Sequence, residues 1–383
     1  MPRPARFVAA FALFAAPLAA QPAQPGLVVP APPADSVEVR ADSFATATGS
    51  HRRMDVYRPR DAAGALPVVV FVNAVTPQLR EWRGYVEWAR LVTRRGLAGV
   101  LYESGGPASP DDLAALLAAL GARGAALGVD GSNVVLWAAS ANGAVGTPAA
   151  LGAVGGPVRG YVLYYGVGEP GPSPRLDVPL LIARAGLDAP QLNRGLDALA
   201  ARLVGAGVPL TLVNHAGGRH GFDLFDDTPA TVAVVGQTLD FVAAATDRRV
   251  QAAIAAGTRE ARGAAALHGE RWPEAIAVYR DLVRERPPST HRYLQLGRAL
   301  LGGGEPAAAL DALDRARALG PAGPRDLGLP GARAALRAGR RDRAVEWLRW
   351  AITNGPPQLR QEIAADAELA PLLAELENRP PSS

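Results

Sequence analysis

The stretch that decides the fold of the first part of the chain is VVLWAASANGAVG, residues 134–146. It begins with an apolar run, the pattern of a strand buried on both faces of a parallel sheet, and Ser140 follows this run at once. A serine at a sharp strand-to-helix turn presents its hydroxyl as a nucleophile. A serine in the same place can also cap the helix through an ordinary hydrogen bond. The stretch therefore predicts a strand followed by a helix and leaves both roles open for Ser140.

Strand and helix patterns alternate on both sides of this stretch. The runs LPVVVFV, residues 66–72, and VPLLIARAG, residues 178–186, are largely apolar segments typical of buried strands. Segments with helical periodicity lie between such runs. This order predicts an α/β domain at residues 36–247, with a mostly parallel sheet flanked by helices.

After residue 247 the strand patterns stop, and the remaining chain is helical and repetitive. Small, bulky and helix-ending residues recur at spacings of 34 and 35 positions. The recurring positions are Ala275, Ala309 and Ala344, then Tyr279, Leu313 and Leu348, then Pro287, Pro321 and Pro356. A period of about 34 residues, with small residues where paired helices cross, is typical of tetratricopeptide repeats. We therefore expect an all-α tetratricopeptide-like domain at residues 256–375, with a surface for a peptide or protein partner; a generic alanine-rich bundle is the alternative.

The composition excludes several kinds of chemistry. The chain has 383 residues and a formal charge of +4, a balance too weak to suggest a nucleic-acid partner. All 40 basic residues are arginine, so neither a Schiff-base lysine nor a Walker-type phosphate loop can form. There is no cysteine, which excludes thiol nucleophiles, disulfides and thiolate-bound metals. No cofactor and no metal ion is expected.

The N-terminus has the pattern of a secretory signal peptide. Arg3 and Arg6 precede the apolar run FVAAFALFAAPLAA, residues 7–20, which is short for a membrane span and suits the core of a signal sequence. We expect residues 1–20 to be removed and the protein to be exported, to the periplasm or outside a bacterial cell, without a stable membrane span. An uncleaved N-terminal anchor is the alternative. Residues 21–35 are proline-rich and predict a flexible linker.

A nucleophilic serine needs a base, and the base needs an acid that orients it. His220 lies in the glycine-rich segment AGGRHGFD, just after the last predicted strand, in a loop of the kind that carries catalytic groups. His215 belongs to the strand-like run TLVNHAG and is interpreted as structural. Asp188 follows the strand at residues 178–186, so it lies at the carboxyl edge of the sheet, where ligands bind. Glu169, in the loop after the preceding strand, is the second choice for the acid.

Three segments, VVLWAASANG, LIARAGLD and GGRHGF, resemble in this order the α/β-hydrolase superfamily, and in particular its dienelactone-hydrolase-like branch. The resemblance covers about residues 37–247. It implies an α/β-hydrolase fold in which Ser140 is the nucleophile, Asp188 the acid and His220 the base. The enzymes that give the branch its name use a cysteine nucleophile, so the serine points to esterase-like relatives. The helical repeats are not part of the minimal family fold and look appended.

The resemblance also implies an oxyanion hole made by two backbone N–H groups. One belongs to Ala141, the residue after the nucleophile. The second comes from Ala74 or Val75 in the segment FVNAVTP, where many relatives have His-Gly-Gly. Two positions after the nucleophile, where the usual pattern has glycine, the chain has Asn142. The shape of the hole is therefore not determined by the sequence.

These features together predict an exported serine hydrolase that cleaves a small carboxylic ester or lactone through an acyl-enzyme on Ser140. The alternative prediction is a weak or inactive hydrolase fold that serves as a scaffold, with the repeats binding a peptide or protein. The departures around the oxyanion hole favour the scaffold. The order of serine, acid and histidine along the chain favours the enzyme.

Overall fold

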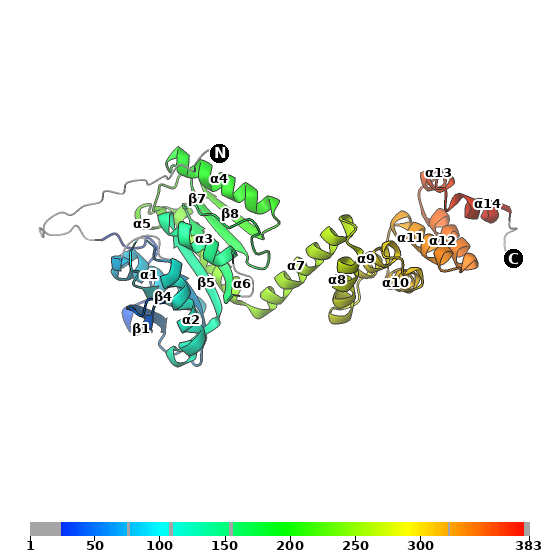
Figure 1. Ribbon diagram of the computed structural model, residues 1–383. Coiled ribbons are helices and arrows are strands. Elements are labelled where there is room, and N and C mark those ends of the chain that lie inside the picture. The colour runs from blue at the N-terminus through cyan, green and yellow to red at the C-terminus, as the bar shows by residue number, and fades with distance from the viewer. Residues whose placement is uncertain (1–23, 75–76, 107–109, 153–155, 321, 379–383) are drawn as a thin grey trace, which may run out of the picture. The chain divides into compact units, whose positions relative to one another are not determined.

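The computed structural model describes residues 24–74, 77–106, 110–152, 156–320 and 322–378 (Figure 1). It divides into two compact units, Met1–Gln251 and Ala252–Ser383. The first unit holds an eight-stranded sheet with helices around it, and the second is helical. Each unit has a hydrophobic core of its own.

The sheet of the first unit has the strand order β1-β2-β4-β3-β5-β6-β7-β8. β2 runs antiparallel to β1 and β4, and every other neighbouring pair is parallel. The strands are β1 Val37–Ala45, β2 His51–Pro59, β3 Leu66–Phe71, β4 Ala98–Tyr102, β5 Val129–Ala139, β6 Val158–Tyr164, β7 Leu180–Ala185 and β8 Leu210–His215. Parallel strands have their carboxyl ends at one edge of a sheet, so the segments that follow β3 to β8 meet at that edge.

Helices cover both faces of this sheet. They are α1 Arg83–Leu91, α2 Pro110–Leu127, α3 Gly143–Leu151, α4 Pro190–Gly205, α5 Phe222–Phe225 and α6 Pro229–Thr246, with 3₁₀ segments η1 Ala34–Ser36, η2 Pro77–Glu81, η3 Val92–Arg95 and η4 Ser140–Asn142. In β3, Val68 and Val70 face the core under α2, α3 and α4, whereas Val69 and Phe71 face the core under α1 and α6. Because both faces are covered, the strand is apolar throughout. The predicted fold class, a mostly parallel sheet flanked by helices and followed by an all-helical region, is confirmed.

Residues 24–36, part of which was expected to be a flexible linker, instead pack against the first unit. Leu27 is buried in the core under α1 and α6. Its N–H donates to Glu87 Oε2 at 2.5 Å, and the N–H of Val28 donates to the carbonyl oxygen of Asp223 at 2.9 Å. The linker prediction weighed the prolines and overlooked the apolar side chain between them, which anchors the segment.

The predicted signal peptide, residues 1–20, lies outside the described residues. Among the helices of the described residues, none is long and apolar enough to cross a lipid bilayer. Export of the protein therefore stays a prediction.

The second unit consists of helices around one core. They are α7 Arg248–His268, whose first residues up to Gln251 belong to the first unit, α8 Trp272–Glu285, α9 Thr290–Gly302, α10 Pro306–Leu319, α11 Pro324–Arg337, α12 Arg341–Asn354, α13 Gln358–Ala364 and α14 Ala370–Asn378. The recurring alanines Ala275, Ala309 and Ala344 are fully buried. A Cβ on Gly297 would lie 2.5 Å from the side chain of Leu313, so the helices approach closely where small residues recur. The tetratricopeptide assignment itself stays a prediction.

The first helix of this region begins at Arg248, ahead of the expected residue 256. The carboxylate of Asp247 accepts the backbone N–H of Arg249 at 2.6 Å, which satisfies one of the free donors of the first turn. An aspartate at this place is a helix-start signal that the repeat spacing did not include. Pro321, one of the recurring prolines, lies outside the described residues.

Candidate active site

Ser140 stands at the end of β5, where the chain turns sharply into η4 and α3. Its φ is +54°, an uncommon left-handed conformation for a residue with a side chain. Glycines allow the chain to pack this tightly: a Cβ on Gly166 would lie 2.5 Å from the carbonyl oxygen of Ser140, and one on Gly143 would lie 2.6 Å from that of Val167. Ser140 therefore has the strained strand-to-helix turn that exposes a hydroxyl.

The structure brings Ser140, His220 and Asp188 into one hydrogen-bonded chain. His220 Nε2 lies 2.9 Å from Ser140 Oγ, and His220 Nδ1 lies 2.7 Å from Asp188 Oδ2. A carboxylate only accepts, so Nδ1 carries the hydrogen of the neutral ring, and Nε2 is left to accept the proton of the hydroxyl. The Asp188 side chain is 5% exposed and that of His220 is 39% exposed. The acid is thus shielded from water, and the base is open to an incoming molecule.

The other candidates for base and acid have different partners. His215, interpreted as structural, is buried at the end of β8, and its Nε2 lies 2.9 Å from Thr231 Oγ1. Glu169, the second choice for the acid, is exposed and accepts from Arg202 at 2.6 Å. Neither has a hydrogen bond to Ser140 or His220 among the described residues.

The loop that carries His220 is held by an internal ion pair. Asp226 accepts the backbone N–H of Arg219 at 2.7 Å and its side-chain Nε–H at 2.6 Å. Burial opposes ionisation of this carboxyl, but the hydrogen bonds from Arg219 hold the pKa of Asp226 below its ordinary value. The N–H of Leu187, which precedes the acid, donates to Gly218 O at 2.9 Å. The loops of the base and the acid are therefore tied to each other.

Of the three residues expected to form the oxyanion hole, the structure describes Ala141 and Ala74. Ala141 is exposed at the start of the turn, and its N–H has no acceptor among the described residues. The N–H of Ala74 donates to Asn142 Oδ1 at 2.7 Å, so it is engaged within the protein and is not a free donor. Val75 lies outside the described residues. Asn142, which stands where glycine is usual, is buried, and its Nδ2 donates to the hydroxyl of Tyr85 at 3.2 Å.

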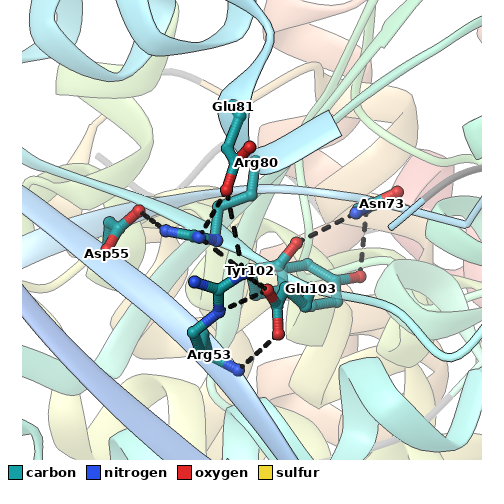
Figure 2. Close-up of polar contacts among 7 residues, drawn as sticks. All are labelled: Arg53, Asp55, Asn73, Arg80, Glu81, Tyr102 and Glu103. Carbon is teal, nitrogen blue, oxygen red and sulfur yellow. Dashed lines mark hydrogen bonds and ion pairs between the residues drawn. The ribbon is translucent and has the colours of Figure 1, made fainter. Parts of the chain in front are cut away.

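A second set of contacts fixes the segment after β3, and sequence reasoning did not find it (Figure 2). The backbone N–H of Asn73 donates to the Tyr102 hydroxyl at 3.1 Å, and its side-chain amide donates to the Tyr102 carbonyl at 2.9 Å. At the far end of the segment, Arg80 in η2 pairs with Asp55 of β2 and lies 3.8 Å from Glu103. Both ends of the segment after β3 are thus fixed to β2 and to the end of β4. No local sequence pattern marks these pairs.

No protein-family model matches the chain, and no curated protein matches it. Similar solved structures include a bacterial heroin esterase, at 19% identity over 56% of this chain and 86% of that chain, with a TM-score of 0.47. Brefeldin A esterase, a bacterial homologue of human hormone sensitive lipase, is 18% identical over 55% of this chain and 78% of its own, with a TM-score of 0.46. Carboxyl esterase 2 from the mycorrhizal fungus Tuber melanosporum is 18% identical over 56% of this chain and 88% of its own, with a TM-score of 0.48.

Proposed function

We propose that the protein is a serine hydrolase that cleaves a carboxylic ester or lactone through a covalent acyl-enzyme. The observation that carries this proposal is the pair of hydrogen bonds made by His220, to Ser140 Oγ at 2.9 Å and to Asp188 Oδ2 at 2.7 Å. Ser140 itself lies on a strained turn. A nucleophile in hydrogen-bond reach of a base, itself oriented by an acid, is the arrangement that acyl transfer needs.

The reaction follows from these contacts. His220 Nε2 takes the proton of Ser140 Oγ as that oxygen attacks the substrate carbonyl, while Asp188 keeps the ring oriented. The tetrahedral oxyanion accepts the free N–H of Ala141. His220 then gives its proton to the leaving alkoxide, and the C–O bond breaks. A water molecule, deprotonated by His220, attacks the acyl-enzyme, so the acid is released and the Ser140 hydroxyl is restored. General-base catalysis contributes about 10²–10⁴-fold to such a rate.

The surroundings of the site support a small substrate. No helix or strand lies between β6 and β7, residues 165–179, so no large lid comes from this connection. A cavity of about 530 Å³ lies between α3, α4 and the segment after β6, with Val167, Leu192 and Leu199 in its lining. Ser140, Asp188 and His220 do not line this cavity, so the proposal of a small substrate rests on the short connection alone.

The first test is covalent labelling with a fluorophosphonate probe, followed by mass spectrometry to locate the adduct. We expect the adduct on Ser140 and expect Ser140→Ala to lose both the adduct and the hydrolysis of p-nitrophenyl acetate while it keeps its melting temperature. An adduct elsewhere, or full turnover by Ser140→Ala, would refute the proposal.

One observation favours a second candidate function. Because Ala74 donates to Asn142, one of the two candidates for the second oxyanion donor is occupied, as in a fold that has become a scaffold. In that case the helical repeats would bind a peptide or protein, and the first unit would only present them. A folded wild-type protein that neither reacts with the probe nor hydrolyses esters would support this second function.

We also infer that the protein works outside the cytoplasm. The support is the sequence of residues 1–20, with two arginines before an apolar run. N-terminal sequencing of the exported protein tests this, since a chain that still begins at Met1 would contradict it.

A further inference from the structure

A buried carboxylate that the proposed reaction does not use lies three residues after the base. Asp223, in α5, is 1% exposed. Its Oδ2 accepts the indole N–H of Trp88 at 2.8 Å, and its Oδ1 accepts the hydroxyl of Tyr165 at 2.6 Å. Burial raises the pKa of Asp223, while the hydrogen bonds from Tyr165 and Trp88 act in the opposite direction. A carboxyl group in apolar surroundings is costly to a fold, so its presence here calls for a reason.

Tyr165 connects this carboxylate to the base. It directly follows β6, and the centre of its ring lies 4.7 Å from the centre of the His220 ring, with the planes inclined at 56°. Its φ is +34°, a left-handed conformation that persists only where the surrounding contacts enforce it. The ring therefore contacts the imidazole while the hydroxyl is held by Asp223.

The charged and titratable groups around the pair come from several elements. His220 faces Ser140 after β5, Asp188 after β7 and Tyr165 after β6. Asp223 faces four side chains: Tyr85 and Trp88 of α1, Tyr164 of β6, and Tyr165. Arg219, the nearest cation along the chain, is neutralised by Asp226. Asp223 is thus a second carboxylate near the base: it reaches His220 through Tyr165, whereas Asp188 contacts the ring directly.

We propose that Asp223 and Tyr165 are positioning residues for His220: the tyrosine ring fixes the orientation of the imidazole, and the buried carboxylate stabilises the imidazolium that forms when Ser140 is deprotonated. The proposal rests on the function proposed above. Inside a protein, charges are screened weakly, so a carboxylate one ring away from the imidazole still favours its charged form.

The decisive variant is Asp223→Asn, which keeps the shape and removes the charge. The NMR signals of the five histidines are followed against pH in the full-length protein, and His220→Gln identifies the relevant signal. We expect the midpoint of His220 protonation to move to lower pH by about one unit. The acidic limb of the kcat/KM profile should move with it, and kcat should fall about tenfold with little change in KM.

Two further variants separate charge from packing. Tyr165→Phe keeps the ring against His220 and removes the hydroxyl that holds Asp223, so the midpoint should move in the same direction by a smaller amount. Asp240→Asn removes an exposed charge from α6 and should change neither the midpoint nor the rate. If Asp223→Asn does not fold, Tyr165→Phe decides the question by the same midpoint.

An unchanged midpoint in a folded Asp223→Asn, whatever its melting temperature, would overturn the proposal and leave Asp223 a structural residue. A shift of equal size in Asp240→Asn would overturn it as well. The titration needs no turnover. A wild-type protein without activity would therefore refute the proposed function, while the midpoints still tell whether Asp223 acts on His220.

Discussion

Asn142 offers the sharpest test of how this site is assembled. Its side chain accepts from the backbone of Ala74 at 2.7 Å and donates to Tyr85 at 3.2 Å, and so connects the turn after β5 with the segment after β3. We interpret it as the brace that sets the position of the oxyanion-binding backbone. Asn142→Ala should therefore weaken both the fold and the reaction.

The size of the effect follows from the two contacts. Each buried hydrogen bond contributes about 1 kcal/mol, and the Ala74 N–H left without an acceptor costs about 1–3 kcal/mol more. A loss of about 3 kcal/mol lowers the melting temperature of a unit of this size by about 10 °C. Loss of one well-placed oxyanion donor lowers kcat by about 10²–10³-fold.

Thermal unfolding and ester hydrolysis are measured on Asn142→Ala and on a matched control, Asn133→Ala. Asn133 is also buried and also in two hydrogen bonds, to Thr246 and Gln251, but it lies inside β5, seven positions before Ser140. The control should lose similar stability and keep its kcat/KM. Activity that is retained or increased in Asn142→Ala would refute the reasoning. It would mean that the Ala74 N–H, once released from Asn142, stabilises the oxyanion at least as well as the wild-type arrangement does.

Three further substitutions have expected outcomes. Gly166→Ala places a Cβ 2.5 Å from the carbonyl oxygen of Ser140, so it should displace the turn and lower kcat/KM by at least about tenfold, as hydrolysis assays would show. The pKa of Asp226 is held below its ordinary value despite burial, so its pairing with Arg219 stabilises the fold above about pH 4 and this contribution is lost as the pH falls through the lowered pKa. The difference in melting temperature between wild type and Asp226→Asn should therefore shrink from about pH 7 to about pH 3. A difference that stays constant with pH would contradict this. Leu27→Asp removes the anchor of residues 24–36 and should destabilise the protein to thermal unfolding by about 2–3 kcal/mol, whereas an unchanged melting curve would show that the segment contributes nothing.

The sheet could be predicted from sequence because its buried strands consist largely of apolar residues. Residues 68–71 are fully buried on both faces, and a continuous apolar run is what two covered faces require. The order of Ser140, Asp188 and His220, together with their places after predicted strands, selected three residues that the structure brings within hydrogen-bond distance. Each follows a strand of one parallel sheet, so topology alone places them at a common edge.

The remaining features depend on hydrogen bonds between residues that are far apart in the sequence and follow no periodic pattern. Asn142 was interpreted as a departure from glycine, because its two partners lie 57 and 68 residues away. Asp223 ends the segment AGGRHGFD, and nothing in that segment indicates its hydrogen bond with Trp88, which lies 135 residues earlier. The proline-rich composition of residues 21–35 likewise did not reveal that Leu27, within the described residues 24–35, is buried in the core.

The buried tyrosines of the first unit determine how this lysine-free protein responds to alkali. Burial raises the pKa of Tyr57 to about 12 and holds five other phenols well above their ordinary value: those of Tyr85, Tyr102, Tyr161, Tyr164 and Tyr165. A phenol whose pKa is raised by folding stabilises the native state fully below about pH 10, and that contribution is lost as the pH rises towards the raised value. Since neither lysine nor cysteine is present to titrate first, the net charge should stay nearly constant in mild alkali. Ionisation of the phenols and loss of the fold should then occur together, in one narrow interval of pH.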